Sequence, residues 1–178
     1  MEDRIFGKLI FTQEAIRSRV RELGLQITSD YQGKELIMIG VLKGAYTFFA
    51  DLSRAVSLPL KVDFVTVFRQ KMVSDLTQNI MGQEVLIVED IVDSGNTGAF
   101  LKREFMARYP KSVRLCTLID KPDNRSANID VDYIGFTLLN KFVVGYGLDY
   151  KDRYRNLPYI SVLDKVQDDI KSDEETLV

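Results

Sequence analysis

The stretch VLIVEDIVDSGNT, residues 85–97, decides the fold class. Its first four residues, Val85 to Val88, form a short apolar run that is typical of a strand buried on both faces. Two acids, Glu89 and Asp90, follow directly, and a turn rich in glycine and hydroxyl groups then leads into an amphipathic segment. A buried strand, a polar turn and a helix in this order predict one unit of a parallel α/β sheet.

The rest of the chain repeats this alternation of strands and helices. Apolar residues at helical spacing predict a helix that Thr12 caps, and further helices are expected over residues 45–56 and from about 98 to 109. Strands are expected at residues 36–42, 62–68, 85–88, 113–119, 133–136 and 143–146, with an edge strand at 159–163. We therefore predict a parallel sheet covered by helices on both faces, in one domain that spans residues 1–178.

Two segments lack a periodic pattern. Residues 69–83 are polar and are predicted to form a loop, long enough for a mobile functional element. Residues 168–178 are dense in charge and poor in apolar side chains, so we expect a frayed tail. Because ligands of parallel sheets bind beyond the carboxyl ends of the strands, the chemistry is expected at that edge.

The composition excludes several kinds of catalytic site. With no His and one Cys in 178 residues, the chain cannot form a Ser-His or Cys-His nucleophile, a His-rich metal site or an internal disulfide. The net charge of -2 gives no electrostatic argument for binding nucleic acid. The first residues are acidic where a signal peptide is basic, and no apolar run is long enough for a membrane span. We expect a soluble, cytoplasmic protein.

The turn after the strand at residues 85–88 has the features of a phosphate site. It consists of Asp93, Ser94, Gly95, Asn96 and Thr97. Because it opens a helix, its backbone N–H groups and two hydroxyl groups point into one small space, and Gly95 lets the backbone approach an anion closely. A plain turn with Ser94 or Thr97 as helix cap is the competing interpretation.

Glu89 and Asp90 next to this turn suggest a ligand that carries hydroxyl groups. Ionised carboxylates only accept hydrogen bonds, and a vicinal diol donates them, so a phosphorylated sugar would fit the acids and the turn together. Two alternatives stay open, namely an acid pair that holds Mg²⁺ as in receiver domains, and two solvated loop carboxylates. The chain contains neither a P-loop nor a dinucleotide-binding glycine motif.

Three motifs, in order along the chain, resemble the hypoxanthine-guanine phosphoribosyltransferase family. Residues 85–97 are similar to its phosphoribosyl-pyrophosphate signature, GVLKGA at 40–45 to its pyrophosphate loop, and KFVVGYGLDY at 141–150, with Arg155 beyond, to a third family motif. The resemblance covers residues 40 to 163 approximately. It implies the type I phosphoribosyltransferase fold, a Rossmann-like parallel sheet flanked by helices, with a small hood formed by the chain termini.

The resemblance also implies a role for each residue of the signature. Glu89 and Asp90 would receive the 2′- and 3′-hydroxyl groups of the ribose, while residues 93–97 would wrap its 5′-phosphate. Asp93 would in addition lie near N7 of the purine as the general acid or base. In this arrangement the two ends of one sugar phosphate are held by a single strand and the turn after it.

The other motifs are expected to bind pyrophosphate and the purine. Lys43, Gly44 and Arg155 would bind pyrophosphate, and the Leu-Lys peptide before Gly44 is cis in relatives. Lys121 would contact the oxygen at C6 of the base and so favour 6-oxopurines over adenine. Without the resemblance, Lys43 is a surface lysine and Lys121 belongs to a plain turn.

The third motif is expected to complete the purine site. Phe142 would stack on the purine face, Val143 would contact the purine edge through its backbone, and Asp149 would lie near the pyrophosphate. Without the resemblance, Phe142 is a core aromatic, and Asp149 and Arg155 form an exposed salt bridge.

The family uses Mg²⁺, for which the resemblance implies Glu89, Asp90 and Asp149 as ligands. The implied reaction transfers a 5-phosphoribosyl group from phosphoribosyl pyrophosphate to hypoxanthine, guanine or both, in purine salvage, and relatives assemble as homodimers or homotetramers. One region departs from the family. Relatives carry a Ser-Tyr pair on a long flexible loop, where this chain has Phe-Arg-Gln-Lys at residues 68–71 and a shorter segment.

Two functions of other classes remain as alternatives. A regulator with the same fold would sense nucleotides and bind RNA, but it needs a basic face that the net charge does not favour. A receiver-type signalling domain would hold Mg²⁺ at Glu89 and Asp90 and would have no purine pocket.

Overall fold

Six strands form the main sheet in the order β4-β3-β2-β5-β6-β7. The computed structural model describes residues 6–139 and 141–163. The strands are β2 (Leu36–Leu42), β3 (Leu60–Phe68), β4 (Lys71–Ser74), β5 (Glu84–Val92), β6 (Ser112–Asp120) and β7 (Tyr133–Thr137). β2, β3, β5, β6 and β7 pair in parallel, whereas β4 pairs antiparallel with β3 at one edge. A three-residue 3₁₀ turn, η1 (Pro122–Asn124), follows β6.

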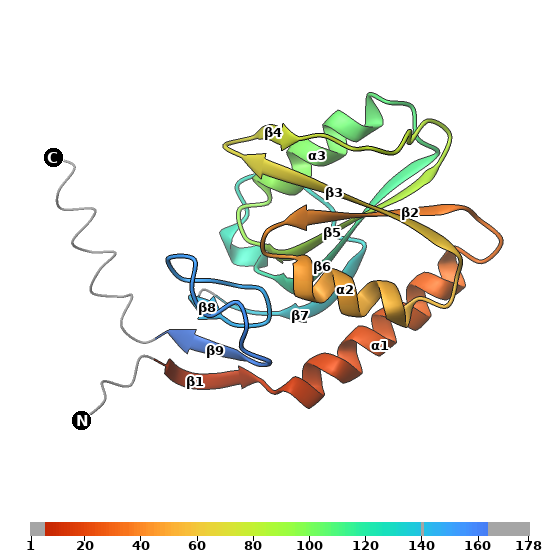
Figure 1. Cartoon of the computed structure of the whole chain (residues 1–178). Helices are drawn as coiled ribbons and strands as arrows, with labels where there is room; N and C mark the ends of the chain where they lie inside the picture. The colour runs from red at the N-terminus through yellow and green to blue at the C-terminus, as the bar shows by residue number, and fades with distance from the viewer. Residues whose placement is uncertain (1–5, 140, 164–178) are drawn as a thin grey trace, which may run out of the picture.

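Helices cover both faces of this sheet, as predicted. α1 (Gln13–Asp30) and α2 (Tyr46–Ala55) pack on one face, and α3 (Asn96–Met106) packs on the other (Figure 1). Thr12 caps α1, because its side-chain oxygen accepts a hydrogen bond from the Ala15 amide. The apolar stripe that predicted this helix is buried against the sheet and α2: it consists of Ile16, Val20, Leu23 and Ile27.

A second, three-stranded sheet forms the hood. Its strands β1 (Phe6–Phe11), β9 (Ile160–Leu163) and β8 (Val143–Val144) pair antiparallel in that order. Figure 1 shows the hood beside the carboxyl ends of the main strands, so two sequence-distant parts of the chain cover the edge where the site is expected. β1 was not predicted.

The predicted loop at residues 69–83 is wrong in its first part. β3 and β4 form a tight hairpin, whose two-residue turn, Arg69 and Gln70, has φ values of 48° and 56°. The chain after β4 is fixed as well, since the Asp63 carboxylate accepts hydrogen bonds from the Thr77 and Gln78 amides at 2.7 and 2.8 Å. Burial alone would raise the pKa of Asp63, but these backbone donors and that of Phe64 hold it below its usual value.

Several predicted boundaries also change. β5 continues through Glu89 and Asp90 to Val92, because β6 pairs with it as far as Asp120. α3 begins two residues earlier than expected and ends at Met106. The predicted strand at 143–146 covers only the two residues of β8. The predicted tail at residues 168–178 lies outside the described residues, and in the described part of the chain no helix combines the length and hydropathy needed to cross a membrane.

Candidate active site

Parallel pairing brings three of the predicted site segments to one edge of the sheet. Gly40 of β2 pairs with Val88 of β5, and Val92 of β5 pairs with Asp120 of β6. The residues that follow these strands therefore start at the same edge, as the direction of parallel strands requires.

The two acids of β5 face opposite sides of the strand. A Cβ atom at Gly44 would lie 1.8 Å from Asp90 Oδ2, so the loop after β2 packs directly on that carboxylate. A Cβ atom at Gly98 would lie 3.5 Å from Glu89 Oε1, which places Glu89 beside the first turn of α3. The two acids therefore belong to β5 instead of following the strand, and their side chains leave it on opposite sides, because side chains alternate along a strand.

Both acids hold protons more tightly than usual. Burial, and then the charge of Asp90, raise the pKa of Glu89 to about 8, although Arg125 acts in the opposite direction. Burial also raises the pKa of Asp90 to about 6, with a further contribution from Asp149. Among the described residues, Glu89 Oε1 is buried and has no hydrogen-bond partner. A buried acceptor of this kind is suited to a ligand that donates hydroxyl groups.

The turn at residues 93–97 is capped by backbone geometry rather than by a side chain. Gly95, with φ of 80°, is the N-cap of α3 and has no side chain to cap the helix, while the Asn96 amide donates to Ser94 Oγ at 3.4 Å. The alternative with Ser94 or Thr97 as helix cap is therefore wrong. The first turn of a helix leaves N–H groups without intrahelical acceptors, so this end of α3 can receive an anion.

Asp93 is held by two donors from the segment after β6. Lys121 Nζ donates to Asp93 Oδ2 at 3.1 Å, and Asn124 Nδ2 donates to Asp93 Oδ1 at 2.8 Å. Lys121 is only 6% exposed. The structure thus brings together the residue predicted as acid or base and the residue predicted to contact the purine.

The loop after β8 packs against the loop after β2. A Cβ atom at Gly147, which has φ of 103°, would lie 2.2 Å from the carbonyl oxygen of Gly44. Arg155 donates to the Gly147 carbonyl oxygen at 2.8 Å and forms an ion pair with Asp149 at 2.7 Å. The Leu-Lys peptide before Gly44 is cis, as the resemblance implied. Lys43 is exposed and pairs with Asp152 at 3.3 Å.

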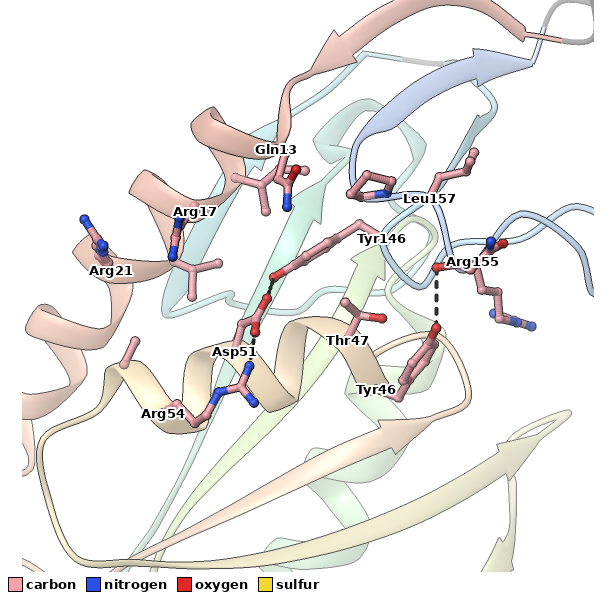
Figure 2. A pocket seen from close by; sticks show the side chains of 15 residues that line it. Gln13, Arg17, Arg21, Tyr46, Thr47, Asp51, Arg54, Tyr146, Arg155 and Leu157 are labelled. Carbon is pink, nitrogen blue, oxygen red and sulfur yellow. Dashed lines mark hydrogen bonds and ion pairs between the residues drawn. The ribbon is translucent and has the colours of Figure 1, made fainter.

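A cleft of about 870 Å³ lies between α1, α2 and the loop after β8 (Figure 2). Tyr146 points from this loop to α2, where its hydroxyl group donates to Asp51 at 2.6 Å, and Arg54 pairs with the same carboxylate. Burial and Asp51 both raise the pKa of Tyr146. Arg155 is the one predicted site residue that lines this cleft. The cleft is therefore separate from the predicted substrate site, and the loop that contains Tyr146 and Arg155 borders it.

Phe142 and Val143 lie at the start of the hood strand β8, one exposed and the other buried. Phe142 is 40% exposed and contacts Tyr150 edge to face, with ring centroids 5.8 Å apart. The alternative that it is a core aromatic is therefore wrong. Val143 is buried in β8, where its backbone belongs to the hood.

Comparisons with known proteins agree with this geometry. The family model described as phosphoribosyl transferase domain matches residues 8–151. A hypoxanthine-guanine phosphoribosyltransferase of Mycobacterium avium is 45% identical over 172 residues, which cover 88% of this chain and 85% of that protein. The chain belongs to the phosphoribosyltransferase family, in its hypoxanthine-guanine branch.

Solved structures of this branch have the same fold. A hypoxanthine-guanine phosphoribosyltransferase of Bacillus anthracis superposes with a TM-score of 0.87 and 40% identity, covering 88% of this chain and 97% of that one. The hypoxanthine phosphoribosyltransferase of Trypanosoma cruzi, in complex with the product IMP, gives a TM-score of 0.86 at 37% identity, covering 92% of this chain and 97% of that one. The predicted type I phosphoribosyltransferase fold is thus confirmed.

The acids of this phosphoribosyltransferase can take part in a magnesium site but cannot complete one. In the described residues, no three acidic, cysteine or histidine side chains gather closely enough to hold a metal. Asp149 does lie close enough to Asp90 for its charge to raise the pKa of that carboxyl group. Two carboxylates of this kind fit Mg²⁺, which usually keeps waters and substrate oxygens as its other ligands.

Sequence reasoning missed three residues that shape the site of this phosphoribosyltransferase. Asn124 and Arg125 contact Asp93, and Tyr146 anchors the loop that carries Gly147. The motif at residues 141–150 contains Tyr146, but its partner Asp51 lies 95 residues away in sequence. For Asn124 and Arg125 the sequence offers no signal, because their contacts depend on how the segment after β6 folds back.

Proposed function

We propose that this protein transfers the 5-phosphoribosyl group of phosphoribosyl pyrophosphate to a 6-oxopurine, hypoxanthine or guanine, with release of pyrophosphate. The observation that carries the proposal is the contact between buried Lys121 and Asp93 at the entrance to α3. Lys121 can donate a hydrogen bond to a purine oxygen, and Asp93 can accept a proton from the purine. Both lie beside the turn at residues 93–97, which can bind an anion. Relatives with names of the same activity support this reading.

The sugar phosphate is bound along the end of β5. Residues 93–97 receive the 5′-phosphate at the start of α3, where free N–H groups and the helix dipole favour an anion. Glu89 and Asp90 accept hydrogen bonds from the ribose hydroxyl groups, Asp90 from the side of Gly44 and Glu89 from the side of Gly98. Binding therefore satisfies the buried oxygen of Glu89.

The purine lies between Lys121 and the hood. Lys121 donates to the oxygen at C6, Phe142 stacks on the ring, and the backbone of Val143 bonds to its edge. Asp93 accepts the proton of N7 as N9 forms its bond to the anomeric carbon and the bond from that carbon to pyrophosphate breaks. The reaction needs no nucleophilic side chain, which is consistent with a chain that has no His.

Pyrophosphate leaves along the loop after β2. Lys43, Gly44 and Arg155 hold it, and the packing of Gly147 on Gly44 fixes this loop. Of the three predicted ligands, Asp90 and Asp149 would hold Mg²⁺ together with substrate oxygens, whereas Glu89 lies on the α3 side of β5. When bound, the ion would neutralise charge on the departing pyrophosphate.

A product assay tests the proposal. The protein is incubated with phosphoribosyl pyrophosphate, Mg²⁺ and one of four bases: hypoxanthine, guanine, xanthine or adenine. We expect nucleotide from hypoxanthine, guanine or both. Conversion of none of the bases, or of adenine alone, would contradict the proposal.

We further propose a cytoplasmic homodimer or homotetramer that binds no nucleic acid. The net charge of -2 gives no electrostatic argument for binding nucleic acid, and the buried free thiol of Cys116 fits a reducing compartment. The oligomeric state is what the family resemblance implies. Light scattering measures the oligomeric state, and a filter-binding assay with RNA separates the enzyme from an RNA-binding regulator of the same fold.

A further inference from the structure

We propose that Asn124 is a positioning residue that fixes the orientation of the Asp93 carboxyl group during proton transfer. This inference rests on the proposed function. Asn124 belongs to the short turn η1, directly after the lysine that is proposed to contact the purine. Neither the family motifs in the sequence nor the predicted site residues include it.

Within the described residues, each carboxylate oxygen of Asp93 accepts a hydrogen bond from one side chain. Asn124 Nδ2 donates to Oδ1 at 2.8 Å, and Lys121 Nζ donates to Oδ2 at 3.1 Å. The Asp93 side chain is 48% exposed, whereas that of Lys121 is 7% exposed. The two donors thus hold a carboxylate that is about half exposed.

When a purine binds, Lys121 gains a second acceptor, whereas Asn124 keeps its hydrogen bond to Asp93. The oxygen at C6 of the base accepts from Lys121, so Oδ2 of Asp93 shares its donor and becomes the acceptor for the N7 proton. The N–H bond at N7 breaks, its electron pair stays on the purine, and the new O–H bond forms at Oδ2. Asn124 remains on Oδ1 throughout.

A carboxyl group needs such a restraint because rotation about its last side-chain bond is soft. With one oxygen held by Asn124, the other keeps a constant direction toward the base. Without Asn124, the orientation of the Asp93 carboxyl group would rest on its hydrogen bond from Lys121, and Lys121 also donates to the bound purine. Correct orientation of a proton acceptor affects turnover far more than it affects the binding of the sugar phosphate.

The backbone around Asn124 is fixed independently of Asp93's side chain. Arg125 Nη1 donates to the carbonyl oxygens of Val92 and Asp93, at 2.9 Å each, and Arg125 also pairs with the buried Asp120. The Asn124 amide donates to the Lys121 carbonyl oxygen at 3.2 Å. The turn is therefore clamped to the end of β5, and it presents the Asn124 side chain to Asp93 in one place.

The test compares Asn124→Ala with Asp123→Ala, an exposed neighbour in the same turn. Steady-state kinetics are measured with hypoxanthine and phosphoribosyl pyrophosphate. We expect Asn124→Ala to lower kcat by about tenfold or more, the usual effect of losing a hydrogen bond to a charged group. The KM for phosphoribosyl pyrophosphate should change little, and Asp123→Ala should behave as the wild type.

A double-mutant cycle separates positioning from a general structural effect. In an Asp93→Asn background, adding Asn124→Ala should cause no further loss of kcat, because the group that Asn124 orients has already been changed. Asn124→Ser is the second variant if Asn124→Ala does not fold, and the same loss is expected of it.

The inference is overturned if kcat of Asn124→Ala matches that of Asp123→Ala, or if the loss is equal in both backgrounds. Either result leaves the proposed function intact, since the wild type still makes nucleotide. A wild type that converts no 6-oxopurine refutes the proposed function and this inference with it.

Discussion

Lys121 carries an ammonium group that is almost completely removed from water. A buried cation is costly unless a partner offsets its lost hydration, and here the partner is Asp93. The ammonium group of Lys121 therefore points toward Asp93, near the N-terminus of α3. If Lys121 contacts the purine as proposed, the base would be selected by a side chain whose position this ion pair restrains.

The first prediction concerns the choice of base. Lys121→Gln removes the charged donor, and we expect kcat/KM for hypoxanthine to fall by about 10- to 100-fold, because a hydrogen bond from a charged group is lost. Discrimination against adenine should fall with it. Assays of both bases measure this, and an unchanged ratio of hypoxanthine to adenine would contradict the assignment of Lys121.

The second prediction concerns stability and pH. The pKa of Glu89 rises from 4.5 to about 8 on folding, so the folded chain binds its proton more tightly than the unfolded chain does. The free energy of unfolding must then fall as pH rises through that interval. Glu89→Gln removes this penalty, and its stabilising effect over wild type should grow between pH 5 and pH 8.

Thermal unfolding of the ligand-free protein at several pH values measures this effect. The control is Glu104→Gln, which changes a carboxylate paired with Arg103 on the surface of α3. A stability difference between Glu89→Gln and wild type that stays constant with pH would show that Glu89 titrates as an ordinary acid.

At the scale of elements, the loops after β2 and β8 touch through two glycines. Gly147 has a positive φ, and its α-carbon packs on the carbonyl group of Gly44. No side chain fits between them. The third prediction is that Gly147→Ala displaces the loop after β2 and raises the KM for phosphoribosyl pyrophosphate by at least about tenfold, as expected when a binding loop is misplaced.

Gly33→Ala is a matched control for this substitution. Gly33 also has a positive φ, of 74°, but a Cβ atom there would meet nothing within 4 Å. It should lose stability, by about 1–2 kcal/mol, through backbone strain alone, and should keep the wild-type KM. Equal kinetic effects of the two substitutions would argue against the packing of Gly147 as the cause.

Elements with local causes could be predicted from the sequence, and those with distant causes could not. The spacing of apolar residues after Thr12 predicts α1, since one stripe suffices to bury that helix. β1 escapes prediction because it forms by pairing with β9 at the other end of the described chain. Glu89 and Asp90 belong to β5 for a similar reason, as β6 extends alongside them.

In the site as well, features with local causes could be predicted from the sequence, and those that depend on distant contacts could not. The motifs could locate the segments around Lys43 and Asp93, because a parallel sheet brings such segments to one edge. The segment of Phe142 instead belongs to the antiparallel hood. The motifs could not show that Glu89 and Asp90 face opposite sides, or that Asn124 reaches Asp93, since both depend on side-chain directions in the folded chain.

At the scale of the whole molecule, the proposed purine site would have two walls from separate sheets. Lys121 follows β6 of the main sheet, whereas Phe142 and Val143 belong to the hood. The fourth prediction is that Phe142→Ala raises the KM for hypoxanthine by about tenfold, within the range of 1–3 kcal/mol for base stacking. Leu139→Ala, at an exposed leucine nearby in the chain, is the control.

Isothermal titration with the purine nucleotide product measures the same contact without turnover. Loss of affinity in Phe142→Ala is expected of a purine site. A receiver-type domain that holds only Mg²⁺ near Glu89 would show no dependence on Phe142, and such a result would remove the purine from the proposal.

The pairing of Phe6–Phe11 with Ile160–Leu163 has a consequence for biosynthesis. While the ribosome is still translating, the strands of the main sheet can assemble as they emerge, but β1 cannot pair until residues 160–163 have been synthesised. A prematurely terminated product that stops before residue 160 would keep Glu89, Asp93 and Lys121 and still lack the partner of its own beginning. Such a product could not close the hood through β9, so we expect the proposed site to stay open on that side.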